Sequence, residues 1–218
     1  MGLRNTLRKG LRDWGFRVPD ALLKDDEPFM RRVAQTLKKT DTVLDLGAHI
    51  GICSIEFAHH AGKVFAVEPH PENYGELVRN TRAYRNISPL NVAVSDQTGT
   101  TKLYFEAPDK KGRNFEGATL MSDKSNISYE RAFDVKSVTL ADLIQDAGSD
   151  VALIKMDIEG AEYRVIEALI ETPAVAKVGK VFVEDHCDRI PGLADHRARV
   201  EARIDALGLR DRFDFTWP

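Results

Sequence analysis

Short apolar segments alternate with amphipathic segments along most of the chain from about residue 41 onward. Five apolar segments have the length and composition of buried strands, at Thr42–Gly47, Lys63–Glu68, Leu90–Ser95, Val151–Asp157 and Lys180–Asp185. Helices are expected between most of them, at Ile50–Ala61, Pro71–Tyr84 and Glu162–Ile170. This alternation predicts an α/β fold with a mostly parallel sheet and helices on both faces.

The segment between the third and fourth expected strands, residues 96–150, is too long for an ordinary loop. Within it, Thr100–Glu106 and Phe133–Leu140 alternate like half-exposed strands around a middle rich in Gly, Ser and Asn. We therefore expect an insertion that forms a hairpin, with its loop over the functional edge of the sheet.

Length, composition and charge restrict the class of protein. With 218 residues and 43% hydrophobic content, the chain can bury one sizeable core. The formal net charge is −3, but residues 1–18 carry +4, so the remainder carries −7 and no nucleic-acid partner is expected. No apolar run approaches the ~18 residues of a membrane span, and no apolar signal segment follows the basic N-terminus. These features predict a cytoplasmic protein.

The two cysteines give no sign of a metal site. Cys53 and Cys187 are isolated in the sequence and lack metal-ligand spacing, so they are expected to be reduced thiols. No metal ligands are predicted.

The motif VLDLGAHIG, at Val43–Gly51, takes a buried strand into a glycine-bearing turn and then a helix. Such a turn brings bare backbone close to a ligand and points helix N–H groups at any anionic part of it. A dinucleotide fingerprint needs G-x-G-x-x-G, whereas here Gly47 and Gly51 are separated by three residues that include His49. Binding of a pyrophosphate is therefore disfavoured.

Glu68 ends the second expected strand, 21 residues after Gly47. A carboxylate at that position can accept hydrogen bonds from the two hydroxyls of a ribose. Together with the glycine turn, it indicates a nucleoside without a diphosphate. S-adenosylmethionine fits, because its carboxylate suits a helix N-terminus and its ammonium group suits a nearby acid such as Asp45.

Six segments of this sequence resemble the FkbM-type S-adenosylmethionine-dependent methyltransferases. They are VLDLGAHIGICS (43–54), VFAVEPHPENYGEL (64–77), NVAVSD (91–96), VTLADLI (138–144), LIKMDIEGAE (153–162) and VFVEDH (181–186). The resemblance covers about residues 41–190. It implies a class I methyltransferase fold, which is Rossmann-like, and commonly O-methylation of a hydroxyl on a sugar, glycolipid, polyketide or similar secondary product.

The resemblance also implies roles for individual residues. Asp45, Gly47 and Gly51 would line the methionine part of the cofactor and Glu68 would hold the ribose. Ser95 or Asp96 would lie near the adenine. The family usually has asparagine where this chain has His49, which can still donate or accept a hydrogen bond beside the cofactor.

Two further expectations follow from the family. Class I methyltransferases usually end with two antiparallel strands, but after a helix at Leu193–Leu207 there is room for one strand, at Arg212–Trp217. The antiparallel edge is therefore expected to be abbreviated, or completed by the insertion. Asn114–Ser122 resembles a segment that this family places near the acceptor, so it is a candidate substrate loop.

Residues 1–40 are expected to form a helical cap within the same domain as residues 41–218. Apolar residues recur there at helical spacing with basic residues between them, at Leu3, Leu7, Leu11 and Trp14. The preferred interpretation is a helix that packs over the cofactor entrance. A weak contact with an acidic membrane surface or a lipid-linked glycan is the alternative.

Three carboxylates follow the fourth expected strand, at Asp157, Glu159 and Glu162. Ligands of parallel sheets bind beyond the carboxyl ends of the strands, so Asp157 and Glu159 are predicted to face the cofactor or the acceptor. Glu162 falls in the first turn of a helix, where capping alone can explain it. Lys155 lies inside the strand, so we expect it to form an ion pair with Asp157 or another acid at a strand end.

His186 is the preferred general base for removing the proton of an acceptor hydroxyl. It ends the fifth expected strand, and an unperturbed histidine has a pKa near ~6.5. Glu184 lies two residues earlier on the same face and is expected to orient or activate the imidazole. A surface histidine without a catalytic role remains the alternative.

Three functions remain in competition at this point. A methyltransferase that acts on a small-molecule or glycan acceptor is preferred. A short-chain nicotinamide-dependent oxidoreductase is disfavoured, because the chain lacks G-x-G-x-x-G and a Tyr-x-x-x-Lys pair after the fourth strand. A non-catalytic module that only binds S-adenosylmethionine is the third.

Overall fold

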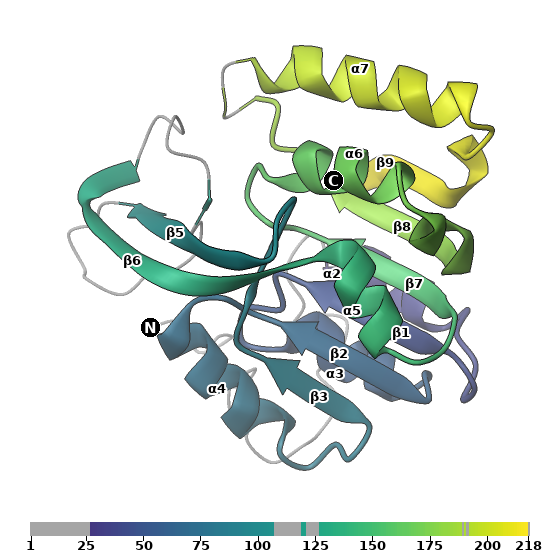
Figure 1. Ribbon diagram of the computed structural model, residues 1–218. Helices are drawn as coiled ribbons and strands as arrows, with labels where there is room; N and C mark the ends of the chain where they lie inside the picture. The colour runs from purple at the N-terminus through teal and green to yellow at the C-terminus, as the bar shows by residue number, and fades with distance from the viewer. Residues whose placement is uncertain (1–26, 107–118, 121–126, 189, 191, 218) are drawn as a thin grey trace.

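The computed structural model describes residues 27–106, 119–120, 127–188, 190 and 192–217. A six-stranded parallel sheet forms its centre, in the order β3-β2-β1-β7-β8-β9 (Figure 1). The strands are β1 (Thr42–Leu46), β2 (Lys63–Val67), β3 (Ile87–Leu90), β7 (Val151–Met156), β8 (Val178–Glu184) and β9 (Phe213–Trp217). Because β1 pairs with both β2 and β7, the strand order reverses at β1, and the predicted class I arrangement is confirmed.

Helices cover the sheet on both faces. They are α2 (Glu27–Ala34), α3 (Ile52–Ala58), α4 (Pro71–Thr81), α5 (Leu140–Asp146), α6 (Glu162–Ile170) and α7 (Leu193–Ala206). Short 3-10 turns lie at Pro173–Lys177 and Arg210–Arg212. Helix α4 begins where the sequence predicts, because Pro71 needs no N–H partner in the first turn and His70 Nδ1 accepts from two backbone N–H groups.

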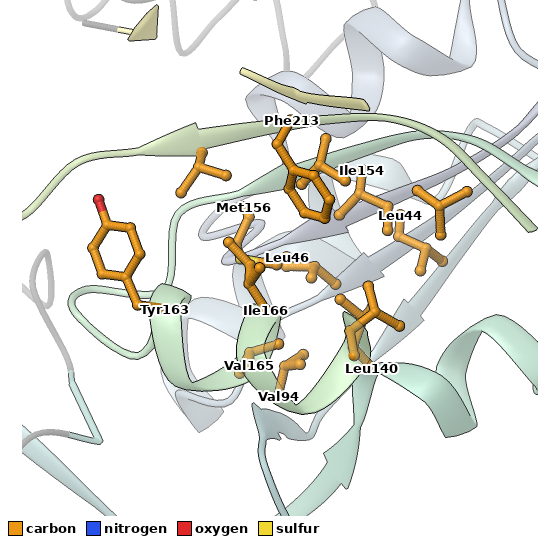
Figure 2. Close-up of a cluster of buried hydrophobic side chains, with 14 of the residues drawn as sticks. Leu44, Leu46, Val94, Leu140, Ile154, Met156, Tyr163, Val165, Ile166 and Phe213 are labelled. Atoms are coloured by element: carbon orange, nitrogen blue, oxygen red, sulfur yellow. The ribbon is translucent and has the colours of Figure 1, made fainter. Parts of the chain in front are cut away.

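The core is divided by the sheet into two clusters. Successive strand residues point to opposite faces, so Leu44 and Ile154 contribute to the cluster against α5, α6 and α7, which Figure 2 shows. Val43 and Leu153 contribute to the opposite cluster, with α2 and α3. The strands are apolar on both faces for this reason.

A second, three-stranded sheet is built from β4 (Ala93–Ser95), β5 (Gly99–Glu106) and β6 (Ile127–Thr139), in the order β4-β6-β5. In Figure 1 it lies beside the end of the main sheet toward which the parallel strands point. The predicted hairpin is confirmed, since β5 and β6 pair antiparallel.

Two details of this region differ from the prediction. The single strand expected at Leu90–Ser95 is wrong, because the chain leaves the main sheet after Leu90 and resumes as β4 in the second sheet. Asn91 holds the break by donating from Nδ2 to the carbonyl oxygens of Glu68 (2.8 Å) and Pro69 (3.0 Å). Helix α5 was not predicted, although Thr139 caps it by accepting from Asp142 N at 3.1 Å.

The final strand also differs from the prediction. There is one strand after α7, as expected, but β9 pairs parallel with β8. An antiparallel edge is therefore wrong for the described part of the chain. The reason is α7, which carries the chain back along the sheet so that β9 starts at the same end as β8. The insertion forms its own sheet and does not complete this edge.

Residues 1–26 of the predicted cap lie outside the described residues. Of the remainder, α2 buries Met30 and Ala34 in the cluster that includes α3. Arg31 on α2 forms an ion pair with Glu56 on α3, and both side chains are buried. None of the helices in the described ranges combines the length and apolar character that a membrane crossing requires.

Candidate active site

The glycine turn after β1 brings the ends of three strands together. Gly47 has a φ of +76°, and a Cβ there would lie 1.7 Å from the carbonyl oxygen of Asp157, at the end of β7. The Gly47 and Ala48 N–H groups both donate to Val67 O, at the end of β2 (3.0 and 2.9 Å). Any side chain at position 47 would collide with the backbone of Asp157, so the packing of the turn itself requires glycine there.

Lys155, on the neighbouring strand β7, also holds this turn in place. Its ammonium group donates to Gly47 O at 2.8 Å and to Asp157 Oδ2 at 3.2 Å, and it lies 3.6 Å from Asp45 Oδ1. Burial alone would lower the pKa of Lys155, but the charges of Asp157 and Asp45 outweigh burial and raise it. The predicted ion pair is confirmed. Asp45 is fully buried and accepts a hydrogen bond from Ser54 Oγ at 2.5 Å.

Glu68 lies at the end of β2 beside this turn. Its Oε2 accepts from His49 N at 2.9 Å, and its Oε1 accepts from His70 N at 2.9 Å and from Asn73 Nδ2 at 3.4 Å. Burial raises the pKa of Glu68 to about 7, against the effect of these hydrogen bonds. The carboxylate is held rigidly, and Oε2 retains capacity for a further donor.

His49 and Gly51 complete the turn. His49 adopts a φ of 49°, which is uncommon for a residue with a side chain, and its N–H reaches Glu68 as a result. Gly51 has a φ of +90°, and a Cβ there would lie 2.7 Å from Leu77 Cδ1 on α4. Both residues therefore set the path of the backbone from β1 into α3.

His186, after β8, is surrounded by carboxylates. Its Nδ1 lies 3.1 Å from Glu162 Oε1, and its Nε2 lies 3.5 Å from Glu159 Oε2, 3.8 Å from Glu184 Oε1 and 3.9 Å from Asp157 Oδ1. The side chain is buried, so the alternative of a surface histidine is wrong. Burial alone would lower the pKa of His186, but the contact with Glu162 and the charges of Glu159 and Asp157 raise it to about 9.

The pKa values of Asp157, just after β7, and Glu184, at the end of β8, are shifted in opposite directions. Burial acts to raise the pKa of Asp157, but Lys155 and His186 hold it below its ordinary value. Burial and then the negative charge of Asp157 raise the pKa of Glu184 to about 7. Asp157 is therefore an anion at neutral pH, whereas Glu184 exchanges a proton readily near it.

Glu162 does more than the helix-capping role that the sequence indicated. Its Oε1 accepts from Ile158 N (2.9 Å) and Gly160 N (3.1 Å), and the same atom contacts His186. It thereby holds Glu159 in a left-handed conformation with a φ of 58°. Sequence analysis missed this function. The available signal was the place of Glu162 beside Tyr163, Val165 and Ile166 on the buried face of α6.

The remaining predicted residues lie farther along the same edge. Ser95 ends β4, and its Oγ donates to Asp96 Oδ1 at 2.9 Å. Of the candidate substrate loop, Asn114–Ser122, the structure describes Thr119 and Leu120, and the rest lies outside the described residues. Thr119 is buried and its Oγ1 donates to Glu159 O at 2.6 Å. This link between the second sheet and the His186 cluster was not predicted.

A family model for the methyltransferase FkbM domain matches residues 45–201. The chain belongs to the FkbM methyltransferase family. The resemblance found in the sequence is thereby confirmed. The nicotinamide oxidoreductase is left without support.

Solved structures resemble parts of this FkbM methyltransferase. The 23S rRNA methyltransferase ErmE is 28% identical over 32% of this chain and 29% of its own, with a TM-score of 0.29. TYW2 of M. jannaschii, in a complex with AdoMet, is 25% identical over 34% of this chain and 38% of its own, with a TM-score of 0.30. Precorrin 8W decarboxylase of Methanobacterium thermoautotrophicum is 11% identical over 88% of this chain and 74% of its own, with a TM-score of 0.46.

The chain therefore spans less than two fifths of the length of ErmE and of TYW2. A search of curated proteins found no match to the chain.

Replacing Lys155 by Met should destabilise the protein by roughly 3–5 kcal/mol, because it leaves buried carboxylates without their cation. The matched control is Lys136→Met, since Lys136 is exposed on β6 and its loss should change stability by less than about 0.5 kcal/mol. Urea unfolding followed by circular dichroism measures both. Equal losses in the two variants would contradict the structural role of Lys155.

The raised pKa of Glu68 predicts a pH dependence of stability. The folded protein favours the protonated carboxyl group, so its contribution is complete below the unfolded pKa near 4.5 and is lost as pH rises through about 7. Glu68→Gln remains neutral throughout. Between pH 5 and pH 8 the free energy of unfolding of the unsubstituted protein should fall by about 2–3 kcal/mol relative to that of Glu68→Gln. Parallel pH curves for the two proteins would show that Glu68 does not titrate in this range.

Proposed function

We propose that this FkbM methyltransferase methylates a hydroxyl group on a sugar, glycan or secondary-metabolite acceptor, with His186 as the general base. The observation that carries the proposal is the convergence of His186 with Asp157, Glu159 and Glu184 at the ends of β7 and β8. This cluster is adjacent to the glycine turn of β1, because Gly47 packs against the backbone of Asp157.

The residues of the turn fit S-adenosylmethionine. Glu68 would hold the ribose, because its carboxylate is fixed by two backbone N–H groups and Oε2 can accept a further hydrogen bond. The backbone of Gly47, His49 and Gly51 would line the methionine part. Asp45 has no exposed surface, so its contribution would be to hold Lys155 and Ser54 in place.

The other end of the cofactor would lie toward β4. Ser95, the last residue of β4, and Asp96, the residue after it, are joined by a hydrogen bond. They would contact the adenine. Asp157 lies between the cofactor turn and His186, where its charge would face the sulfonium or the acceptor.

When bound, the cofactor supplies a methyl group on a positively charged sulfur, which an oxygen nucleophile attacks in line. The protein must align the acceptor hydroxyl and remove its proton. His186 is suited to this by position, because Glu162 contacts Nδ1 and thereby orients Nε2 toward the carboxylate cluster. With a pKa raised to about 9, only the neutral fraction of the imidazole accepts the proton, so turnover should increase as pH rises toward 9. Burial of the imidazole keeps bulk water from the site of transfer.

The acceptor class can be tested with methyl-labelled S-adenosylmethionine and a panel of hydroxylated sugars, glycolipids and polyketides. Calorimetry should show binding of S-adenosylmethionine and S-adenosylhomocysteine but not NAD. Label should enter an acceptor hydroxyl and should be absent when that hydroxyl is replaced by hydrogen. Transfer to an amine alone would overturn the proposal of O-methylation.

His186→Ala should lower kcat by about 10² to 10⁴, the usual contribution of a general base. Binding of S-adenosylmethionine should remain within about two-fold, because His186 is assigned to the acceptor side. The matched control is His196→Ala. His196 lies on α7, its imidazole is 3.0 Å from Glu167, and it has no assigned part in the reaction. Unchanged turnover in His186→Ala would show that another group is the base. Binding of the cofactor by the native chain without turnover on any acceptor would instead favour a module that only binds S-adenosylmethionine.

A further inference from the structure

We propose that Asp157, Glu159 and His186 bind a divalent metal cation that positions the acceptor hydroxyl. The inference rests on the proposed O-methylation and adds a site that the sequence did not predict. With Nε2 bound to the ion, His186 would be a ligand, and the role of general base would pass from His186 to Glu184. One ligand atom from each residue lies within 4.8 Å of the other two. The three come from the end of β7, the turn that follows it, and the end of β8.

The separations between these atoms match a shared ion. Ligand atoms ~2.1 Å from one cation lie roughly 3 to 3.5 Å apart at angles of 90° to 109°. His186 Nε2 lies 3.5 Å from Glu159 Oε2 and 3.9 Å from Asp157 Oδ1. Small side-chain movements would bring both oxygens into that range.

His186 provides an observation independent of the acidic residues. The side chain is 1% exposed, and neither ring nitrogen forms a hydrogen bond with the residues that the structure describes, although Nδ1 lies 3.1 Å from Glu162 Oε1. A buried polar nitrogen without a partner is costly. It points into the group of carboxylates at distances too long for hydrogen bonds, which is the arrangement expected of a ligand before its ion is added.

Glu162 prepares two of the three ligands. Its contact with Nδ1 favours the tautomer with the hydrogen on Nδ1, which leaves the lone pair of Nε2 for a metal. Through the N–H groups of Ile158 and Gly160, the same oxygen sets the turn that carries Glu159. Glu159 is held with a positive φ, and such strain is often retained where a side chain must be placed for function.

The local charge also favours a cation. Four carboxylates lie within 3.9 Å of the His186 ring nitrogens, at Asp157, Glu159, Glu162 and Glu184. The imidazole supplies at most one positive charge, and Lys155 already contacts both Asp157 and Asp45. A divalent cation would add positive charge at the point where these carboxylates gather. One imidazole nitrogen with two carboxylate oxygens favours a first-row transition ion such as Mn²⁺ over Mg²⁺.

The ion would change how the acceptor loses its proton. With Nε2 acting as a ligand, a bound cation would polarise the acceptor oxygen and make its hydroxyl proton easier to remove. Glu184 lies 3.8 Å from Nε2 and is not one of the ligands, so its carboxylate would be placed to accept that proton. The oxygen forms its bond to the methyl carbon while the carbon–sulfur bond breaks, and S-adenosylhomocysteine leaves.

The test is a titration of the full chain with MnCl₂ alone, after treatment with a chelator and dialysis, followed by electron paramagnetic resonance of free Mn²⁺. One ion should bind per chain. Glu159→Gln, which preserves the shape of a partly exposed side chain, should weaken binding by at least about 10-fold. Glu167→Gln is the matched control, because Glu167 also contacts an imidazole, that of His196, on the exposed side of α6 and α7.

Absence of stoichiometric Mn²⁺ binding to the native chain, or equal affinities in Glu159→Gln and Glu167→Gln, would overturn the inference. Methyl transfer separates it from the proposed function. Activity that EDTA abolishes and Mn²⁺ restores supports the site. If methyl transfer to a hydroxyl is insensitive to EDTA, the metal site is overturned and the proposed function stands. If the chain binds Mn²⁺ but transfers methyl groups only to nitrogen, the metal site stands and the proposed O-methylation is overturned.

Discussion

The buried ammonium group of Lys155 is the interaction on which the arrangement of the site depends. It joins β7 to the end of β1 through the carbonyl oxygen of Gly47 while it neutralises Asp157 and Asp45. A lysine on a buried strand is tolerated only with such partners. The same contacts fix the distance between the glycine turn and the cluster around His186, so a requirement of folding also sets the geometry of the site proposed for methyl transfer.

The main sheet could be predicted because its strands are buried on both faces and therefore read as apolar segments in the sequence. α6 was predicted at its observed bounds, Glu162–Ile170, because its apolar face and the following Pro173 are local signals. Pairing between strands is not a local property. The break after Leu90 depends on Asn91 reaching the carbonyls of Glu68 and Pro69, and the direction of β9 depends on how α7 packs.

The site was predictable to the extent that chemistry follows strand ends. Asp157, Glu159, Glu184 and His186 were each assigned to the carboxyl edge of the sheet, and they do meet there. Their mutual orientation was not predictable, because it depends on Glu162. In the sequence, Glu162 stands in the first turn of a helix, and helix capping alone explains a glutamate there. The spacing of residues in a sequence does not reveal that one oxygen, Glu162 Oε1, contacts both the turn and the imidazole of His186.

The hydrogen bond from Thr119 to the carbonyl oxygen of Glu159 connects the second sheet to the strained turn. Thr119 is also paired with Tyr104 of β5 through two backbone hydrogen bonds. Thermodynamic linkage makes such a connection reciprocal: any molecule that binds the second sheet more tightly in this conformation also favours the observed position of Glu159. Recognition of the acceptor at a distance from the reacting atoms would thus be coupled, in free energy, to the assembly of the reaction centre.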